Sequence, residues 1–316
     1  MFFSKSVRLT LTGIFFASFS ACLGGTTFVF TRMVVPQTDP ATLSFLRYSL
    51  IALILFAFSI RQVLKTRLRK QDIIGIAIIG LGMFAIFPFF MAFGLKFTTA
   101  ARGGLLYATM PLATIIIATL FKIEKLNISK LLAVMLAMIG VALAIGTNIK
   151  PETLLLLKGD SLVMVGVFGA AIFTVFSGKY MGRYGNLPVM VYASISGVSA
   201  TFILSLLIGA PFEGSLSFDG FGWFSIFMLT APGGALMMYS WGRALMIITP
   251  TQAAISLGFN PLIAMLLGAL LIGEEITLMF VVGFLMVISA VVLANFSFFN
   301  TAAASHEQDK AKSDKA

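Results

Sequence analysis

The segment YATMPLATIIIATLFKIE, residues 107–124, returns in altered form as LGFNPLIAMLLGALLIGE, residues 257–274. Both copies have Pro-Leu at their fifth and sixth positions and close on a glutamate 13 residues after the proline. Matched letters in Leu-rich segments can recur by chance, so the repeat has to be judged over a longer stretch of the chain.

The correspondence continues upstream of this segment. FGLKFTTAARG (93–103) aligns with RALMIITPTQA (243–253) at the same offset of 150, and TDPATLSFLRYSL (38–50) aligns with NLPVMVYASISGV (186–198) at an offset of 148. Agreement over several elements is stronger than any single motif. The sequence therefore predicts two related halves.

Composition places these halves in a membrane. The chain is 59% hydrophobic and 11% charged, with a mean hydropathy of +1.02, which exceeds what a soluble domain of 316 residues can bury. Each span needs roughly 20 apolar residues, and runs without polar alternation favour helices over barrel strands. Ten membrane helices are predicted, at 9–30, 42–60, 73–95, 100–121, 128–147, 160–178, 188–208, 220–241, 250–272 and 276–298.

The odd number of helices in each half decides its orientation. Because five is odd, the second half must enter the membrane in the opposite sense to the first. We therefore predict an all-α integral membrane protein with ten transmembrane helices in two inverted five-helix repeats, residues 9–147 and 160–298. A polar tail follows at 299–316. Inverted repeats of this kind suit alternating access to a central site.

The positive charges indicate the orientation of the whole chain. Of 22 Lys and Arg residues, 16 fall on the membrane face that holds both termini, 5 fall on the other face, and Arg47 alone lies within a span. Lys and Arg concentrate on the cytoplasmic side, so both termini are predicted to be cytoplasmic in a multi-pass protein of the plasma membrane. The charges sit in short breaks between apolar spans, a pattern that argues against a nucleic-acid partner and for the lipid bilayer.

Several motifs resemble those of one transporter family. Each half has an Ala/Gly-Leu segment, the Pro-Leu and the following Glu; LRY at 46–48 and GTTFVFTR at 25–32 add to the pattern. On these residues the chain is similar to the drug/metabolite transporter superfamily, EamA type, from about residue 10 to 298. The resemblance implies a ten-helix fold that moves amino acids, other metabolites or drugs, often outward. It departs at Gly24 and Thr27, where many relatives have Trp and Asn.

Arg47 is the one charged residue predicted to lie within a span and away from its ends. A charge there costs roughly 2.5–3.5 kcal/mol on insertion scales, so it is a functional candidate by default. Two roles are open: a contact for a carboxylate or other anion in the cavity, or a structural tie to backbone carbonyls and helix ends. Because helix 2 begins near residue 42, the side chain could also reach the outer interface.

Other candidates for substrate contact are sought among uncharged polar and aromatic side chains on helices 3, 4, 8 and 9. Asn260 is the strongest of them, because Pro261 prevents one backbone hydrogen bond and frees a carbonyl beside it. Tyr239 and Trp241 fit an aromatic belt at the membrane interface equally well. The full set of candidates is Arg47, Tyr107, Tyr239, Trp241, Gln252, Ser256 and Asn260.

Prolines and two glutamates mark the candidate helix breaks and gates. Prolines within apolar spans in both halves point to the substrate cavity. These are Pro88, Pro111, Pro232 and Pro261. Glu124 and Glu274 follow apolar runs, and ordering the turns between helices 4 and 5 and between helices 9 and 10 is favoured over substrate contact. As equivalents in an inverted repeat they would lie on opposite membrane faces, where such turns can also gate.

These residues favour a secondary transporter for small metabolites such as amino acids, and the family resemblance implies an exporter. All twelve acidic residues fall at helix ends, loops or the tail, and the single histidine, His306, lies in the tail. No buried proton relay is evident, which favours facilitated diffusion, exchange or coupling through end-of-helix groups such as Asp160. The alternatives are an integral membrane enzyme, for which the catalytic cluster is missing, and a non-transporting scaffold. No metal or other cofactor is expected.

Overall fold

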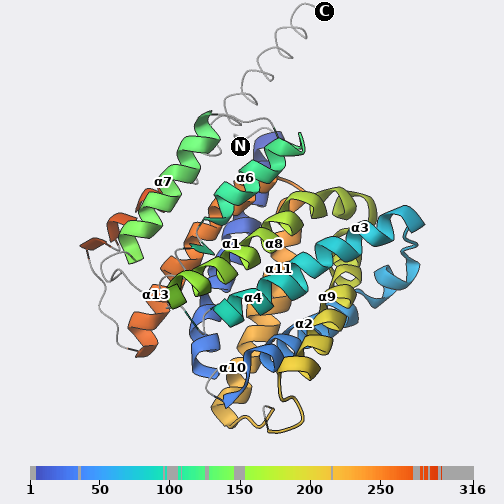
Figure 1. The fold of residues 1–316 in the computed structure, drawn as a ribbon. Coiled ribbons are helices and arrows are strands. Elements are labelled where there is room, and N and C mark those ends of the chain that lie inside the picture. The colour runs from blue at the N-terminus through green and yellow to red at the C-terminus, as the bar shows by residue number, and fades with distance from the viewer. Residues whose placement is uncertain are drawn as a thin grey trace, which may run out of the picture.

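The computed structural model describes residues 5–34, 37–94, 97, 106–107, 109–124, 128–145, 154–214, 216–272, 278–279, 281–283, 285–290 and 293. Within these ranges the chain is helical apart from turns and short connections, and they contain no β-strand (Figure 1). The predicted all-α class is therefore confirmed for the described residues.

Helix bounds are as follows. In the first half the elements are α1 (Lys5–Val34), α2 (Pro40–Lys65), α3 (Lys70–Leu81), the π-helical segment η2 (Gly82–Ile86), α4 (Phe87–Gly94), α6 (Met110–Leu120) and α7 (Ile128–Ile145). In the second half they are α8 (Leu154–Tyr184), α9 (Asn186–Ile208), α10 (Gly220–Thr230), the π-helical segment η4 (Ala231–Leu236), α11 (Met237–Leu245), α12 (Pro250–Ile255), the 3₁₀ segment η5 (Ser256–Gly258) and α13 (Phe259–Ile272).

The protein has several helices that can cross a membrane. Among the described residues, six are long and apolar enough by length and composition: Arg8–Thr31, Pro40–Lys65, Lys70–Gly94, Leu157–Tyr184, Asn186–Ile208 and Gly220–Leu245. Met110–Leu120 and Leu131–Gly140 are shorter apolar helices. Of the predicted span 276–298 the structure describes only part, so the count of ten stays a prediction.

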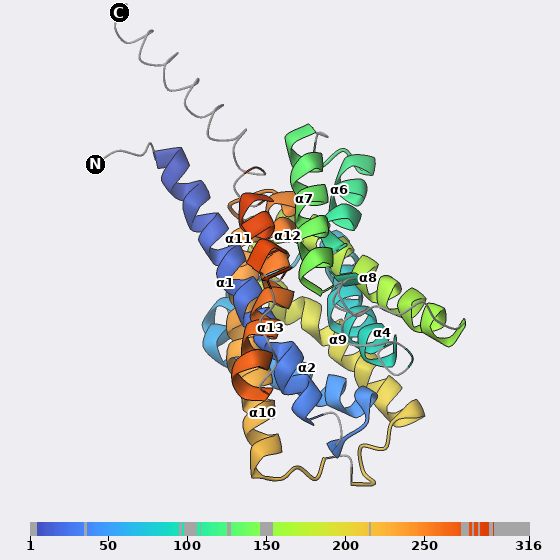
Figure 2. The same ribbon diagram turned by 90° about the vertical axis from the view of Figure 1, so that its left-hand side faces the viewer.

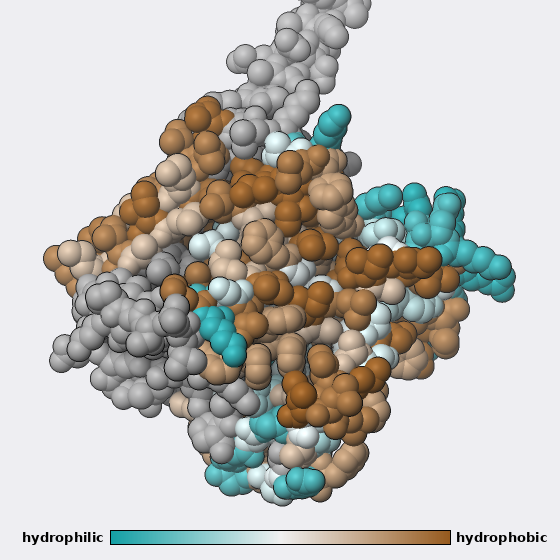
Figure 3. All heavy atoms as spheres, in the orientation of Figure 1, coloured by the Kyte–Doolittle hydropathy of each residue, from teal (hydrophilic) through white to brown (hydrophobic). Residues whose placement is uncertain are grey.

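The surface of the bundle matches a lipid environment. Apolar residues cover much of the coloured surface in Figure 3. Large apolar side chains such as Phe58 and Leu207 are exposed. Hydrophilic residues gather instead at helix ends, including the turn between α2 and α3 at the right of the view. The exposed basic residues of this turn are Arg61, Lys65, Arg67, Arg69 and Lys70. Such a surface is stable only where hydrocarbon replaces water.

Two predicted spans are broken where continuous helices were expected. The span 250–272 divides into α12, η5 and α13. In the span 100–121, Thr109 forms a turn and α6 begins at Met110. Both interruptions lie just before the repeated prolines, Pro111 and Pro261. A proline provides no backbone N–H and crowds the carbonyl four residues earlier, so the preceding turn cannot keep regular α geometry.

A π-helical turn interrupts the third helix of each half. The turns end at Ile86 and Leu236, which are 150 residues apart, the same offset that relates the repeated sequences. Proline accounts for both positions: Pro232 lies inside η4, and Pro88 lies two residues after η2. A proline crowds the carbonyl four residues earlier, which for Pro88 is that of Phe84. Single π turns of this kind occur frequently at functional sites.

Helix packing places both π segments near the centre of the bundle. α2 lies beside α9, while α8 packs against α3, η2, α4 and α6 (Figures 1 and 2). Phe84 of η2 is fully buried, with its ring centroid 5.8 Å from that of Tyr48 and 6.0 Å from that of Phe173. Gly82 and Gly169 allow the backbones of η2 and α8 to approach closely, since a Cβ at either one would lie 2.8 Å from the carbonyl oxygen of the other.

Candidate functional site

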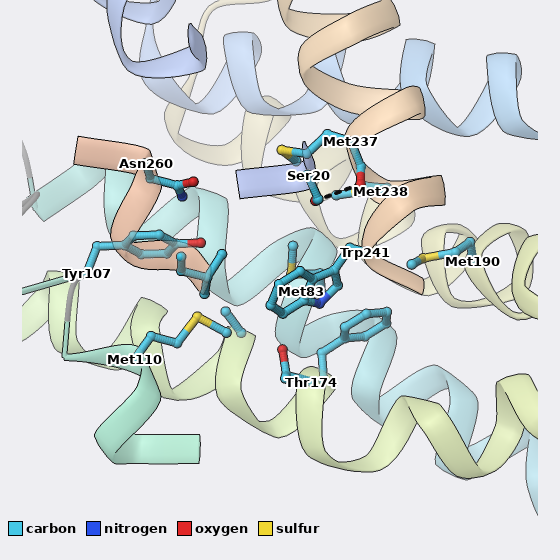
Figure 4. A pocket seen from close by; sticks show the side chains of 13 residues that line it. Ser20, Met83, Tyr107, Met110, Thr174, Met190, Met237, Met238, Trp241 and Asn260 are labelled. Carbon is cyan, nitrogen blue, oxygen red and sulfur yellow. Dashed lines mark hydrogen bonds between the residues drawn. The ribbon is translucent and has the colours of Figure 1, made fainter. Parts of the chain in front are cut away.

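A cavity opens between the two halves of the chain. About 450 Å³ between its lining atoms is unfilled, but this volume includes open solvent at the mouth, so the enclosed part is smaller. Thirteen residues line it, drawn from α1, η2, residue 107, α6, α8, α9, α11, η5 and α13 (Figure 4). They are Ser20, Met83, Tyr107, Met110, Ala170, Phe173, Thr174, Met190, Met237, Met238, Trp241, Leu257 and Asn260. Contributions from both halves make this a site that relative motion of the halves would reshape.

Residues at matching positions of the two similar segments, 107–124 and 257–274, line the same cavity. Tyr107 and Leu257 are 150 residues apart, as are Met110 and Asn260, and all four line the cavity. They lie at the broken helices, immediately before or at the start of α6 and α13. The interruptions that the repeated prolines introduce therefore bring both copies of this segment to one cavity.

Asn260 forms a polar end of the cavity. Its side chain is buried, and its Oδ1 atom has no hydrogen-bond partner among the described residues. The amide faces the hydroxyl of Tyr107 and is close enough to interact with it (Figure 4). Gly24 of α1 leaves room for this amide, since a Cβ there would lie 3.0 Å from Oδ1. A buried amide oxygen without a partner is a site where a ligand's donor gains a full hydrogen bond.

Two hydroxyls lie elsewhere in the lining. Ser20 donates to the carbonyl oxygen of Met237 at 2.8 Å, which ties α1 to α11 (Figure 4). The buried Thr174 Oγ1 of α8 has no partner within the described part of the chain. The Trp241 ring, 6% exposed, belongs to the same cavity. Polar atoms thus occur at separate points around an apolar space.

Most of the lining is apolar and rich in sulfur. Five of the thirteen lining residues are methionine, and Phe173, Trp241 and Tyr107 add aromatic rings. None of the thirteen is Asp, Glu, Lys, Arg or His. Such a lining suits a ligand with an apolar body, which a small number of uncharged polar groups would orient.

Arg47 lies outside this lining. Its Nη2 donates to the carbonyl oxygen of Gly233 in η4 at 3.2 Å, and its guanidinium carbon lies 5.5 Å from the centroid of the Tyr48 ring. The structural tie to a backbone carbonyl is thus present. Arg47 is also close enough to Tyr107 for its charge to act on that hydroxyl. An anion beside Tyr107 would lie in the field of Arg47 without direct contact.

The other predicted contact residues are divided by the structure. Tyr107, Trp241 and Asn260 line the cavity, whereas Tyr239, Gln252 and Ser256 do not. Tyr239 is half-buried, and its carbonyl oxygen accepts from Asn186 Nδ2 at 2.8 Å. Substrate contact by these three residues stays a prediction.

Gln252 and Ser256 have identifiable surroundings. The Gln252 side chain accepts from the backbone N–H of Thr249 at 3.1 Å, and the backbone N–H of Gln252 donates to the Thr249 hydroxyl. This capping box starts α12 and has the sequence pattern Thr-x-x-Gln. Ser256 is buried in η5, next to the lining residue Leu257.

Glu124 connects the broken helices across the repeat. Its carboxylate is buried and accepts from the backbone N–H of Thr251 at 3.0 Å. The contact joins the end of α6 to the first turn of α12. Glu124 is thus tied to α12, and the ordering of the turn between helices 4 and 5 stays a prediction. Glu274 falls outside the described residues.

Sequence reasoning missed most of the lining. The apolar members, including Met83, Met190 and Phe173, are indistinguishable by sequence from residues that pack in the core or face lipid. Ser20 and Thr174 carried a weak signal, as isolated hydroxyl residues within apolar spans. The helical period of the sequence cannot show that such residues line a cavity, because it does not indicate which neighbouring helix each face of a helix contacts.

A multi-pass helical membrane protein with a cavity between its halves fits the class of membrane transporters. The EamA-like transporter family matches residues 11–146 and 157–296. The chain therefore belongs to the EamA-like transporter family, within the drug/metabolite transporter superfamily.

Individual relatives agree with this assignment. The chain is 26% identical over 278 residues to the uncharacterized transporter YyaM of Bacillus subtilis, covering 86% of this chain and 89% of the relative. It is 25% identical over 265 residues to an uncharacterized transporter of Archaeoglobus fulgidus, covering 82% and 90%. One crystal structure matches with a TM-score of 0.75 at 16% identity, over 92% of this chain and 97% of that chain. That likeness shows the fold alone.

Proposed function

We propose that the protein is a secondary transporter in which two inverted five-helix repeats, residues 9–147 and 160–298, alternately expose the central cavity. The observation that carries the proposal is the paired contribution of both repeats to that cavity, Tyr107 with Leu257 and Met110 with Asn260. The π segments at the same offset and the twofold match of the family support the repeat as well. Ten membrane helices follow from two five-helix units.

Reciprocal helix packing supports the same arrangement. If helix n corresponds to helix n + 5, the contacts of helix 1 should be mirrored by those of helix 6. α1 packs against α10, η4 and α11, while α8 packs against α3, η2 and α4. Likewise, α1 packs against α13 and α8 against α6. A twofold axis in the membrane plane accounts for these paired contacts.

The substrate class follows from the two parts of the cavity. An amphiphilic carboxylate such as an amino acid would place its polar end beside Asn260 and Tyr107, where the Arg47 charge favours an anion. Its apolar body would occupy the methionine-rich part. Outward transport across the plasma membrane, with both termini in the cytoplasm, rests on the family resemblance and on the distribution of Lys and Arg.

Glu124 provides a candidate gate for this cycle. Its buried contact with Thr251 joins helices 4 and 9 at the end assigned to the cytoplasm. In an inverted repeat, Glu274 is the equivalent residue at the opposite end. Alternate formation of the two contacts would close one end of the cavity at a time, and the helix breaks at Pro88, Pro111, Pro232 and Pro261 would absorb the movement.

Efflux from proteoliposomes tests the function. Vesicles with wild-type protein would be loaded with a mixture of the twenty standard amino acids, and released solutes would be identified by mass spectrometry with and without a pH gradient. We expect release of at least one amino acid with an apolar side chain. The gradient arm reports whether protons are coupled to transport.

Matched variants test the site. Tyr107→Phe and Asn260→Ala should each reduce the initial rate about tenfold, since a lost hydrogen bond in a buried site costs about 1–3 kcal/mol. Tyr180→Phe, which removes the same hydroxyl from α8 outside the lining, should stay near wild type. Absence of release of any solute would contradict transport of this class. A chemically altered solute would instead favour the alternative of a membrane enzyme, and protein without either activity would favour a scaffold.

A further inference from the structure

We infer that the cavity methionines set a preference for aromatic over equally large aliphatic substrate bodies. The inference deepens the proposed function and rests on it. The chain has 17 methionines in 316 residues, and five of them are among the thirteen residues that line this one cavity. The concentration is local, and sequence gives no reason for it because leucine would be equally apolar and of similar volume.

The methionines surround the cavity from both halves. Met83 lies on η2 and Met110 on α6, whereas Met190 lies on α9 and Met237 and Met238 lie on α11. They come from four separate elements, so they are not one stripe along a single helix. In Figure 4, Met110 lies near the Asn260 end, Met83 lies beside the Trp241 ring, and Met190 lies beyond that ring.

Thioether sulfur has properties that leucine lacks. It is polarizable and makes favourable contacts with the edges of aromatic rings at about 5 Å, and the unbranched side chain adapts to ligands of different outline. The lining also supplies three aromatic groups, Phe173, Trp241 and Tyr107, which favour offset or edge-on contact with a further ring. Both the thioether sulfurs and the aromatic rings therefore bind a flat π system more favourably than a saturated ring of the same size.

The polar groups of the lining agree with one orientation of such a ligand. Asn260 Oδ1 lacks a partner among the described residues at one end of the cavity, and no charged side chain belongs to the lining. An amino acid would therefore keep its polar end at Asn260 and Tyr107, with its ammonium group donating to Asn260 Oδ1. Its ring would then lie against the sulfur atoms of the opposite part.

Tryptophan fluorescence measures binding directly. The chain has two tryptophans, and Trp223 on α10 is 50% exposed and outside the lining. In a Trp223→Phe background, Trp241 alone reports on the cavity. Phenylalanine and cyclohexylalanine are the matched probes, because they share charge and approximate size and differ in the aromatic character of the ring. We expect phenylalanine to bind about threefold to tenfold more tightly.

Sulfur is then removed without change of polarity. Met83→Leu with Met190→Leu in the same background should bring the ratio of the two dissociation constants close to one, mainly by weakening phenylalanine. Met135→Leu, an exposed position on α7, is the control and should keep the ratio. A ratio of one in the parent protein, or an unchanged ratio in the double variant, overturns the inference.

The efflux assay separates this inference from the proposed function. Equal efflux and equal binding of the two probes would leave transport established and overturn the role of the methionines. Failure of the wild-type protein to bind or release either probe would overturn the proposed substrate class, and the inference with it.

Discussion

Replacing Gly169 with alanine tests the close approach of η2 and α8. The added Cβ would lie 2.8 Å from the carbonyl oxygen of Gly82 and 3.0 Å from Cγ2 of Ile86. The first neighbour is backbone, so the helices must separate. Overpacking of this kind costs about 1–3 kcal/mol, whereas alanine returns roughly 0.5–1 kcal/mol of helix propensity. We expect a net loss of stability.

A second glycine in the same helix provides the control. Gly182 lies in α8 near the helix end, and a Cβ added there would have no neighbouring atom within 4 Å among the described residues. Gly182→Ala gains propensity without a clash, so the difference between the two variants isolates the packing cost of about 1–3 kcal/mol. Purified proteins would be compared by thermal unfolding in one detergent. We expect Gly169→Ala to unfold several degrees below Gly182→Ala.

The same contact can be approached from the other side. A Cβ at Gly82 would lie 2.8 Å from the carbonyl oxygen of Gly169, so Gly82→Ala disturbs the same pair of backbones. Because the two substitutions share one contact, their effects should not add in the double variant. Equal unfolding temperatures for Gly169→Ala and Gly182→Ala would refute the close approach, and strict additivity would refute the shared contact.

Two further predictions concern carboxylates. Glu124→Ala leaves the buried N–H of Thr251 without its acceptor. It should destabilise the protein by about 1–3 kcal/mol, while Glu213→Ala at an exposed turn should not; equal thermal midpoints would contradict this. The backbone N–H of Gly222 lowers the pKa of Asp219 from its ordinary value of 3.8. Its stabilising effect is therefore complete above that value and lost as pH falls through the lower folded pKa. Thermal scans should show the advantage of wild type over Asp219→Asn shrinking in acid, and a constant advantage would exclude this role.

Several features of the fold were accessible from sequence because each depends on local chemistry. Long apolar runs must be helical in hydrocarbon, where every backbone N–H and C=O needs an internal partner. The capping box that starts α12 is also local, since Thr249 and Gln252 show the Thr-x-x-Gln pattern in the sequence. Three residues of separation are enough to indicate a capping role for Gln252.

The candidate site could be predicted only in part from the sequence, because its contacts join residues that are far apart in the chain. Asn260, Tyr107 and Trp241 stood out as polar or amphipathic groups in apolar spans, and the structure brings all three to one cavity. The partner of Arg47 could not be foreseen, because Gly233 is 186 residues away and presents its carbonyl from a π turn. The partner of Glu124 is 127 residues away and equally non-local.

By itself, the sequence determined that this is a helical membrane protein. Its apolar runs are long enough to cross a bilayer, and its apolar residues are too many for a water-soluble domain to bury. The sequence also showed that two similar segments lie 150 residues apart, because such a similarity can be found from the order of residues alone. Tertiary structure alone decided which apolar residues line the cavity. Methionine on a helix is the same in sequence whether it meets lipid, core or ligand, and only the packing of distant helices assigns its neighbours.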